Sequence, residues 1–394
     1  MPMGEPVMQT NGRGYRPAGV NRRGFLISAA SLAGIAASAE AAQPGVGASA
    51  ENAQPVPAAA PRAPYRIGIL GTGAVAKQAV IDPAASVPEV TIEAVSSRDA
   101  QRGRAYADAH HIPRSMSYED LVKDPGIDIV YITLPNSLHA EWSMRALQAG
   151  KHVLCEKPMC SNAREAAEVA AAARSSDRVF MEGFHFPYHP FSKRVRDMLD
   201  THAIGRVQSV DVMFEIPSQV FGSPQSIRRQ FALGGGSIMD AGCYAILGIR
   251  EILGEPERVS SAHAETDPHE PQIDMRMDAT LLFSGGRRAH LRTSFLGTQK
   301  GRAVPLLTVH GETGTLAVKS FVVPQWGASL HMEWPRHTYN EAADQTPSFI
   351  FQLRELVRCI RDGAPVLTSA DNGLANMRVI DAIYTKAGLK PRGT

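Results

Sequence analysis

The feature that most constrains the fold of this chain is a short apolar run followed at once by closely spaced glycines. Residues 65–70 read Tyr-Arg-Ile-Gly-Ile-Leu, and residues 71–76 read Gly-Thr-Gly-Ala-Val-Ala before an expected helix. A Gly-x-Gly-x-x-Ala turn between a strand and a helix is typical of open parallel α/β sheets that bind a dinucleotide. Gly71 permits the tight turn, Gly73 lets the backbone approach a pyrophosphate, and Ala76 keeps the helix close to the strand. We therefore expect a dinucleotide site here; a purely structural glycine turn is the alternative.

The end of the next expected strand favours NADP over NAD. This strand covers residues 90–95, and Ser97, Arg98 and Asp99 follow it, with Arg102 one helical turn further. NAD enzymes usually carry an acid at this strand end for the ribose 2′-hydroxyl, whereas a hydroxyl group with guanidinium groups suits a 2′-phosphate. Asp99 is the competing acid, but we expect it to cap the following helix.

Two further strand–helix units place polar motifs at the same edge of the sheet. A strand at 127–133 leads into Leu134-Pro135-Asn136 and His139, and a strand at 151–155 leads into Glu156-Lys157-Pro158. Ligands bind beyond the carboxyl ends of the strands in such sheets, so these motifs should converge on the cofactor. The predicted cofactor-binding residues are Gly71, Thr72, Gly73, Ala74, Val75, Ser97, Arg98, Arg102, Leu134, Pro135, Asn136, His139, Glu156 and Lys157.

Taken together, these motifs resemble the Gfo/Idh/MocA oxidoreductases over about residues 65–390. Two further blocks, 181–190 and 235–244, are similar to the dihydrodiol dehydrogenase and NADP-dependent xylose dehydrogenase branch. The Ser97–Arg102 arrangement is closer to glucose–fructose oxidoreductase. The resemblance implies an α/β protein: an N-terminal Rossmann domain, then an α/β domain whose open antiparallel sheet often forms the oligomer interface.

An expected helix over about 237–253 carries the proposed catalytic pair. Asp240 and Tyr244 are four residues apart and therefore share one helix face. Removing the proton of a sugar hydroxyl requires a base, and a nearby cation such as Lys157 should lower the high pKa of a tyrosine. We predict Tyr244 as proton acceptor or donor, Lys157 as its electrostatic partner and Asp240 as a ligand of substrate hydroxyls. Whether Lys157 or Tyr244 moves the proton stays open.

Structural alternatives exist for several of these residues. Ser237 and Asp240 resemble a capping box, and Tyr244 could be a core tyrosine. His185 and Tyr188 are weaker candidates for the edge of the nicotinamide or substrate pocket.

The N-terminus reads as an export signal. Arg22-Arg23 precedes Phe25-Leu26 and a short Ala-rich apolar run, and small residues follow at 37–39. This pattern is typical of twin-arginine signals; a disordered tail that contains two arginines is the alternative. We expect a signal peptide over 1–39, a Pro/Ala-rich arm over 40–64 and a periplasmic location. The twin-arginine route carries folded proteins, so the cofactor could travel already bound.

Composition and residue spacing argue against several classes of binding partner. With 41 Lys and Arg against 39 Asp and Glu, the net charge of +2 argues against a nucleic-acid binder. No apolar run in the sequence suggests membrane insertion. No His, Cys and carboxylate grouping has convincing metal-ligand spacing. We expect all four cysteines to be free thiols.

The second half of the chain reads as strands followed by two helices. Alternating apolar residues at 207–216 indicate a half-buried strand, and further strands are expected at 258–265, 275–283, 287–296, 305–310 and 314–319. Helices should follow near 347–362 and 371–387. We expect a Rossmann domain over 65–185 and a substrate and oligomerisation domain over 186–394, with the last helices able to pack back on the first domain. A homodimer or tetramer through the second sheet is expected.

These observations predict a periplasmic NADP-dependent sugar oxidoreductase that transfers hydride between carbon 1 of an aldose and the nicotinamide, giving a lactone. A second sugar could reoxidise a tightly held cofactor. A trans-dihydrodiol or 1,5-anhydrofructose-type NADPH reductase is an alternative. A non-catalytic, cofactor-bound sensor on the same fold is another.

Overall fold

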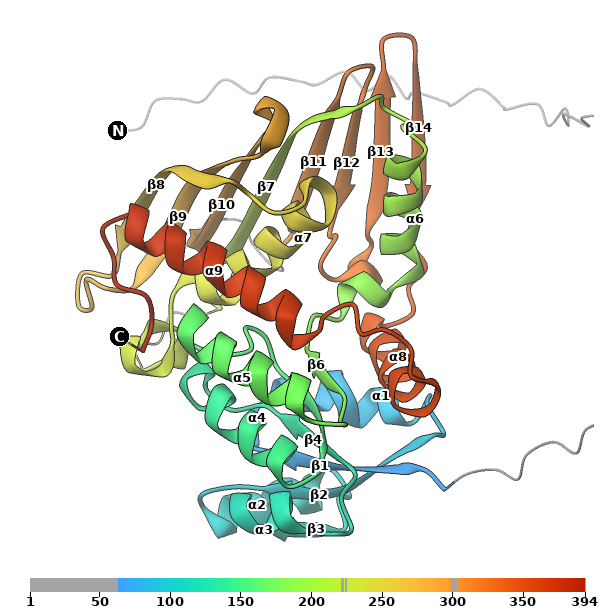
Figure 1. Cartoon of the computed structure of the whole chain (residues 1–394), viewed down its shortest axis with the longest axis vertical. Coiled ribbons are helices and arrows are strands. Elements are labelled where there is room, and N and C mark those ends of the chain that lie inside the picture. Colours follow the sequence, from blue (N-terminus) through green and yellow to red (C-terminus); the bar gives the residue numbers. More distant parts are fainter. Residues whose placement is uncertain (1–62, 221–222, 224, 299–302, 394) are drawn as a thin grey trace, which may run out of the picture. The chain divides into compact units, whose positions relative to one another are not determined.

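The computed structural model describes residues 63–220, 223, 225–298 and 303–393. The expected signal segment 1–39 and nearly all of the expected arm 40–64 lie outside these residues. The described part contains two sheets, and the Rossmann sheet lies below the larger sheet in Figure 1.

The first sheet is doubly wound, with strand order β3-β2-β1-β4-β5-β6 and parallel pairing throughout. Its inner strands are apolar runs buried on both faces, which is typical of a parallel sheet that helices cover on both sides. The order reverses between β1 and β4, where open α/β sheets bind ligands. The strands are β1 Tyr65–Leu70, β2 Val90–Ser96, β3 Arg114–Met116, β4 Ile129–Ile132, β5 His152–Cys155 and β6 Phe180–Glu182.

Three helices of this half begin at a polar side chain that accepts free backbone N–H groups. Asp99 accepts from Gln101 and Arg102 at the start of α2, as predicted, and Asn162 accepts from Glu165 at the start of α5. After β1 the chain enters a helical stretch that includes a π-helical turn. The elements are η1 Lys77–Ile81, α1 Asp82–Ala84, α2 Ala100–Ala109, α3 Tyr118–Lys123, η2 Asn136–Leu138, α4 His139–Gln148 and α5 Ala163–Ser175.

The second sheet has eight strands in the order β14-β13-β12-β11-β7-β10-β9-β8. It is mostly antiparallel, as predicted, and β7 and β10 form a parallel pair within it. The hairpin β13–β14 was not predicted, because β14 is polar and almost wholly exposed. The strands are β7 Val207–Pro217, β8 Arg258–Thr266, β9 Asp274–Leu282, β10 Arg288–Gly297, β11 Leu306–Gly311, β12 Thr315–Lys319, β13 Ser329–Trp334 and β14 His337–Ala342.

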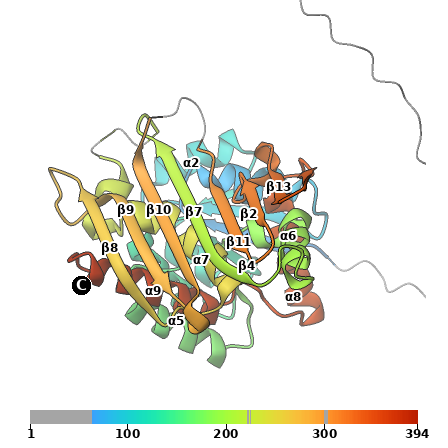
Figure 2. The same ribbon diagram turned by 90° about the horizontal axis from the view of Figure 1, so that it is seen from above.

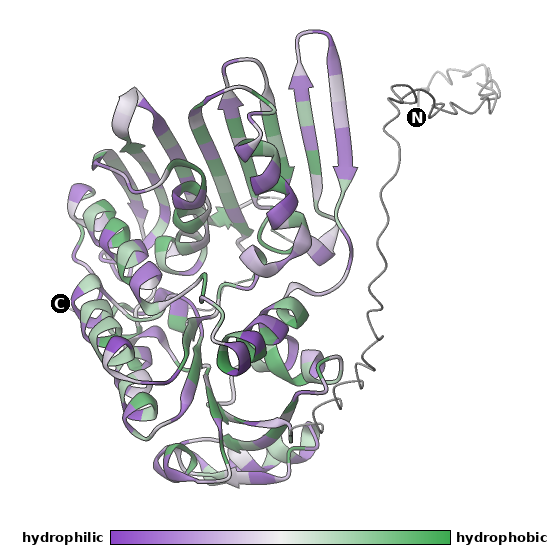
Figure 3. Cartoon of the chain, turned by 45° about the vertical axis from the view of Figure 1, so that its right-hand side comes forward, coloured by the Kyte–Doolittle hydropathy of each residue, from purple (hydrophilic) through white to green (hydrophobic). Residues whose placement is uncertain are grey.

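One face of this sheet is covered by helices and the other is open. α7 (Cys243–Leu253) packs on β7 and β10, and α9 (Ala370–Lys386) packs on β8. Figure 2 shows the strands in front of these helices, and Figure 3 shows apolar and polar residues alternating along them. The open face carries polar pairs such as Arg292–Asp278, with 2.6 Å between Nε and Oδ1.

The end of the chain returns to the first half of the protein. Leu353 of α8 (Ser348–Asp362) is fully buried in one cluster with Ile67 of β1 and Val80 of η1. α9 also packs on α5 and α7. Helix α6 (Pro190–Asp200) follows the last strand of the first sheet, β6, and precedes the first strand of the second sheet, β7.

One described helical stretch, Phe231–Leu253, is apolar and long enough to cross a membrane. The apolar part of this stretch is 83% buried inside the protein, as in the core helix of a globular fold.

Candidate active site

A cavity of about 930 Å³ lies beyond the carboxyl ends of β1, β2, β4 and β5 and reaches the second sheet. Every predicted cofactor-binding residue lines it except Ser97, whose hydroxyl accepts the backbone N–H of Asp99. Phe214, Ile216, Val323 and other apolar side chains form the wall on the side of the second sheet. The predicted residues at the cavity are Gly71, Thr72, Gly73, Ala74, Val75, Arg98, Arg102, Leu134, Pro135, Asn136, His139, Glu156, Lys157, His185, Asp240 and Tyr244.

The glycine turn fits its predicted place at the end of β1. Gly71 has a φ of 104°, which favours glycine, and its backbone N–H donates to the carbonyl oxygen of Ser96. A Cβ atom at Gly73 would lie 2.4 Å from Oγ1 of Thr133, at the end of β4. The turn can lie so close to β4 only because both residues lack a side chain.

The end of β2 fits a 2′-phosphate better than a free 2′-hydroxyl. Arg98 and Arg102 line the cavity, and Nε of Arg102 donates to Oγ1 of Thr72 over 2.7 Å. The carboxylate of Asp99 accepts the backbone N–H groups of Arg102 and Gln101, which hold its pKa below the usual value. The one acid at this strand end is thus engaged as a helix cap, and two cations face the cavity.

Lys157, Asp240 and Tyr244 come together as predicted, although they derive from distant segments. Nζ of Lys157 donates to Oδ1 of Asp240 over 2.9 Å and to its backbone carbonyl over 2.9 Å. The same Nζ lies 4.7 Å from the centroid of the Tyr244 ring. Asp240 lies in the π-helical segment η6 (Ile238–Gly242), which runs directly into α7. Such π-turns occur frequently at functional sites.

The second carboxylate oxygen of Asp240 accepts from Arg228, over 2.9 Å from Nε. Arg228 lies in η4 (Ile227–Arg229) and lines the cavity, yet it was not predicted, because no motif marks that segment. The capping-box alternative for Asp240 is wrong. Ser237 makes no capping bond and instead donates its hydroxyl to Asp274.

Burial and the two cations set the charges of this cluster. Burial opposes ionisation of Asp240, but Arg228 and Lys157 outweigh it and hold the pKa of this carboxyl well below its usual range. Burial also disfavours a charged Lys157, yet Asp240 and then Tyr244 outweigh it and raise the pKa of the ammonium. At neutral pH the unliganded protein therefore holds a carboxylate between two cations.

The pKa of Tyr244 moves opposite to our expectation. Burial raises the pKa of this phenol, and Lys157 offsets only part of the rise. The side chain of Tyr244 is 8% exposed, and Asp240 already neutralises much of the lysine charge. The phenol is therefore protonated at neutral pH and can donate a hydrogen bond or a proton.

Three other predicted residues anchor the walls of the cavity. Glu156 accepts from the hydroxyl of Tyr131 over 2.8 Å, and burial raises the pKa of this carboxyl. The ring nitrogens of His139 each lie 2.8 Å from a carbonyl oxygen, one of Leu134 and one of Pro158. Nδ2 of Asn136 donates to the carbonyl of Gly234 over 2.8 Å. These side chains fix loops of the site to one another.

Of the two weaker candidates, His185 lies at the cavity and Tyr188 does not. His185 lines the cavity, where Nδ1 lies 2.7 Å from the Ser348 hydroxyl and burial lowers its pKa to about 3. The hydroxyl of Tyr188 pairs with Thr368 over 2.8 Å, away from the cavity, so the prediction for Tyr188 is wrong. The turn η3 (Phe186–Tyr188) between them sends the two side chains in different directions.

Comparisons with known proteins decide the family. Residues 65–184 match the model of an oxidoreductase family with an NAD-binding Rossmann fold, and residues 192–317 match the Gfo/Idh/MocA C-terminal domain. The D-xylose 1-dehydrogenase (NADP(+)) 2 of Haloferax volcanii is 35% identical over 324 residues, which are 81% of this chain and 96% of the relative. The chain belongs to the Gfo/Idh/MocA oxidoreductases.

Other members of the Gfo/Idh/MocA family resemble it along most of their length. The trans-1,2-dihydrobenzene-1,2-diol dehydrogenase of Xenopus laevis is 29% identical and covers 77% of this chain and 93% of the relative. The solved structure of aldose-aldose oxidoreductase from Caulobacter crescentus, complexed with glycerol, has a TM-score of 0.74 and 28% identity, with 82% and 98% of the chains covered. A 3-ketoreductase from Actinomadura kijaniata, in complex with TDP-benzene and NADP, has a TM-score of 0.72 and 26% identity, with the same coverage.

This Gfo/Idh/MocA protein is thus an NADP-dependent dehydrogenase or reductase of sugars or related compounds, an enzyme that acts on CH–OH groups. The cations at the end of β2 and the glycine turn at the end of β1 are the features of this chain that fit NADP.

Proposed function

We propose that this enzyme oxidises an aldose or a related polyol at carbon 1 to the lactone, and that Lys157, Tyr244 and Asp240 carry the reaction. The observation that supports this most is the cluster of these three side chains at one end of the cavity. When bound, NADP supplies the acceptor for the hydride of carbon 1.

The chain's own task is to bind the sugar and to move the hydroxyl proton. Asp240 is the proposed acceptor of hydrogen bonds from sugar hydroxyls, because each of its oxygens binds one cation and keeps a further lone pair. Tyr244 or Lys157 exchanges the proton of the reacting oxygen. Since both are protonated in the free enzyme, they are set to donate a proton to a carbonyl, and one must lose its proton before a lactone forms.

Variants of the two proton-transfer candidates test this assignment. Tyr244→Phe and Lys157→Met should each reduce kcat by orders of magnitude while circular dichroism stays close to wild type, and Tyr244→Phe should also leave the dissociation constant of NADP close to wild type. The control is Lys193→Ala, a change on the exposed surface of α6, which should leave kcat unchanged. Near-normal rates in both site variants would sink the assignment.

We further propose export through the twin-arginine route and a cofactor that stays bound and is reoxidised by a second sugar. The Arg22-Arg23 signature supports the first part, and the likeness to an aldose-aldose oxidoreductase supports the second. Arg22→Lys/Arg23→Lys should move the protein from the periplasmic to the cytoplasmic fraction; unchanged fractionation would refute export.

A sugar panel followed at 340 nm distinguishes the proposed reactions. A bound-cofactor signal that cycles only when two sugars are present supports the aldose reaction with recycling. Steady consumption of added NADPH with a dihydrodiol or 1,5-anhydrofructose-type substrate supports the reductase instead. No redox change with any substrate supports the sensor.

We also propose that the open face of the eight-stranded sheet joins subunits into a homodimer or tetramer. A shallow groove of about 370 Å³ crosses this face between Asp211, His263 and Arg292. Light scattering of wild type and of the charge-reversal variant Arg292→Glu checks this; a monomeric wild type would refute it.

A further inference from the structure

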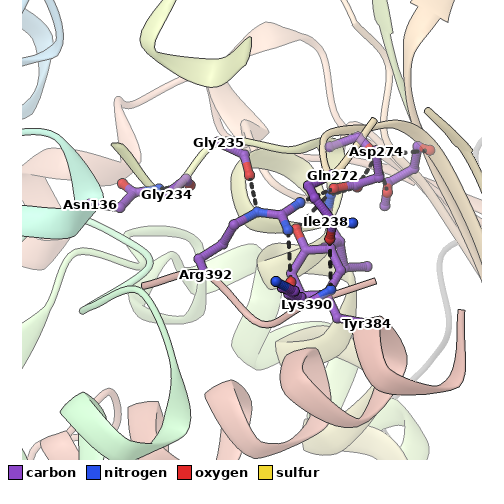
Figure 4. A network of polar contacts seen from close by, with 11 residues as sticks. Asn136, Gly234, Gly235, Ile238, Gln272, Asp274, Tyr384, Lys390 and Arg392 are labelled. Atoms are coloured by element: carbon purple, nitrogen blue, oxygen red, sulfur yellow. Dashed lines mark hydrogen bonds and ion pairs between the residues drawn. The ribbon is translucent and has the colours of Figure 1, made fainter. Parts of the chain in front are cut away.

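A buried ion pair lies directly behind the start of the catalytic helix, on the side away from the cavity. Nη2 of Arg392 donates to Oδ1 of Asp274 over 2.7 Å, and both side chains are fully buried. The guanidinium also lies 3.9 Å above the ring centroid of Tyr384, whose hydroxyl donates to the same oxygen of Asp274. Figure 4 shows Arg392 and Tyr384 beside the carboxylate of Asp274.

This pair holds the backbone that leads into Asp240 and Tyr244. Oδ2 of Asp274 accepts the backbone N–H of Ile238 and the hydroxyl of Ser237, each over 2.8 Å. Asp274, the first residue of β9, thus satisfies a free backbone N–H at the start of the helical segment that carries Asp240. Nε of Arg392 donates to the carbonyl of Gly235 over 2.6 Å. Both contacts lie within six residues of Asp240.

The glycine segment 234–236 leaves room for this cluster on one side and forms the cavity wall on the other. A Cβ atom at Gly236 would lie 2.2 Å from Oδ1 of Asp274 and 2.8 Å from Nη2 of Arg392. Gly234 accepts from Asn136 of the predicted cofactor site (Figure 4). Gly235 and Gly236 therefore contact the Arg392–Asp274 pair, and all three glycine residues also line the cavity.

Arg392 also reaches the first half of the protein. Its backbone carbonyl accepts from Nδ2 of Asn162 over 2.7 Å, and Asn162 is the cap of α5, five residues after Lys157. One residue therefore connects the loop that carries Lys157 with the segment that precedes Asp240. Lys157 and Asp240 are the two partners of the 2.9 Å ion pair in the site.

We propose that Arg392, with Asp274, is a positioning residue that sets the catalytic helix and the loop of Lys157 against each other. This inference rests on the proposed function, in which Lys157, Asp240 and Tyr244 carry the reaction. Arg392 is not among the residues that line the cavity; it acts on Gly235 directly and on Ile238 through Asp274.

The test compares Arg392→Lys with a matched control, Arg250→Lys. Arg250 is also buried, lies in the last turn of the same helix and pairs with Glu255. Arg392→Lys keeps the charge but loses the planar fork, so kcat should fall tenfold or more, with the NADP dissociation constant within threefold. The primary isotope effect on kcat with a C1-deuterated aldose should rise, because a misplaced helix slows the hydride step. Arg250→Lys should leave kcat within twofold.

Hydrogen exchange gives a readout that does not need turnover. Arg392→Lys should raise amide exchange at 236–242 at least tenfold and leave α5 beyond its first turn unchanged, whereas Arg250→Lys should act near 248–253. Tyr384→Phe keeps the ion pair and serves as a milder variant, with a several-fold loss of kcat, should Arg392→Lys not fold. Equal kcat in Arg392→Lys and Arg250→Lys, or unchanged exchange at 236–242, overturns this proposal. Absence of turnover in the wild type overturns the proposed function alone, and exchange then decides the role of Arg392.

Discussion

Removal of Arg98 and Arg102 should convert the preference of the enzyme for NADP into indifference between NADP and NAD. Both side chains line the cavity at the end of β2, and Thr72 orients Arg102 through a 2.7 Å hydrogen bond. Asp99, the nearby acid, caps α2 through its Oδ1, which accepts the backbone N–H groups of Gln101 and Arg102. Discrimination therefore depends on the two guanidinium groups.

The magnitude follows from the environment of these side chains. A hydrogen bond to a charged group contributes about 1.5–3 kcal/mol, and the lower end applies because Arg98 and Arg102 are exposed to solvent. About 1.4 kcal/mol corresponds to a factor of ten in affinity. Each single change to Ala should thus weaken NADP about tenfold, and the double variant about a hundredfold if the two contacts add.

Fluorescence titration of the protein freed of bound cofactor, with NADPH and with NADH, measures the two dissociation constants directly. NADH lacks the 2′-phosphate, so its dissociation constant should change less than twofold in all variants. Arg104→Ala removes another exposed cation from the same helix and should change neither constant. Equal loss of NADPH and NADH affinity, or the same loss in Arg104→Ala, would refute the assignment of the 2′-phosphate site.

Three further predictions follow from the charges and the packing. Because the pKa values of both Tyr244 and Lys157 are raised, lactone formation should rise steadily with pH over 6–10, while carbonyl reduction stays flat; a plateau of oxidation near pH 7 contradicts this. Burial raises the pKa of Glu182 to about 8 from an ordinary 4.5, so the native state keeps a proton that the unfolded chain has lost, and stability falls as pH rises between these values. Glu182→Gln should flatten that fall in urea titrations at pH 5 and 8, and an unchanged slope would argue against it. Leu353→Ala, in the buried apolar cluster that α8 shares with β1 and η1, should cost about 2–5 kcal/mol of unfolding free energy, whereas a loss below about 1 kcal/mol would mean that α8 adds little to this core.

The local motifs of the first half were predictable because they depend on backbone geometry over a few residues. The glycine turn after β1, the caps Asp99 and Asn162, and the placement of Lys157 at the end of β5 each follow from short-range rules. The four-residue spacing of Asp240 and Tyr244 likewise indicated one helix face, although a π-turn begins that helix.

The features that the sequence did not predict depend on contacts between distant segments of the chain. Alternation marked β7 as half-buried, but it carries no information on the direction of its neighbour β10. Arg228 reaches Asp240 from a segment without a motif, and the hydroxyl of Tyr188 finds Thr368, 180 residues later. The pKa of Tyr244 was predicted from the cation alone, and the degree of burial that outweighs Lys157 exists only in the folded chain.

The most direct test of the central claim is hydride transfer itself. Purified enzyme with NADP and an aldose that carries deuterium at carbon 1 should show a slower rise at 340 nm than with the protium sugar, and mass spectrometry should find the label in NADPH. Tyr244→Phe should abolish most of the signal. Absence of label from the cofactor, with any sugar that supports turnover, would contradict oxidation at carbon 1.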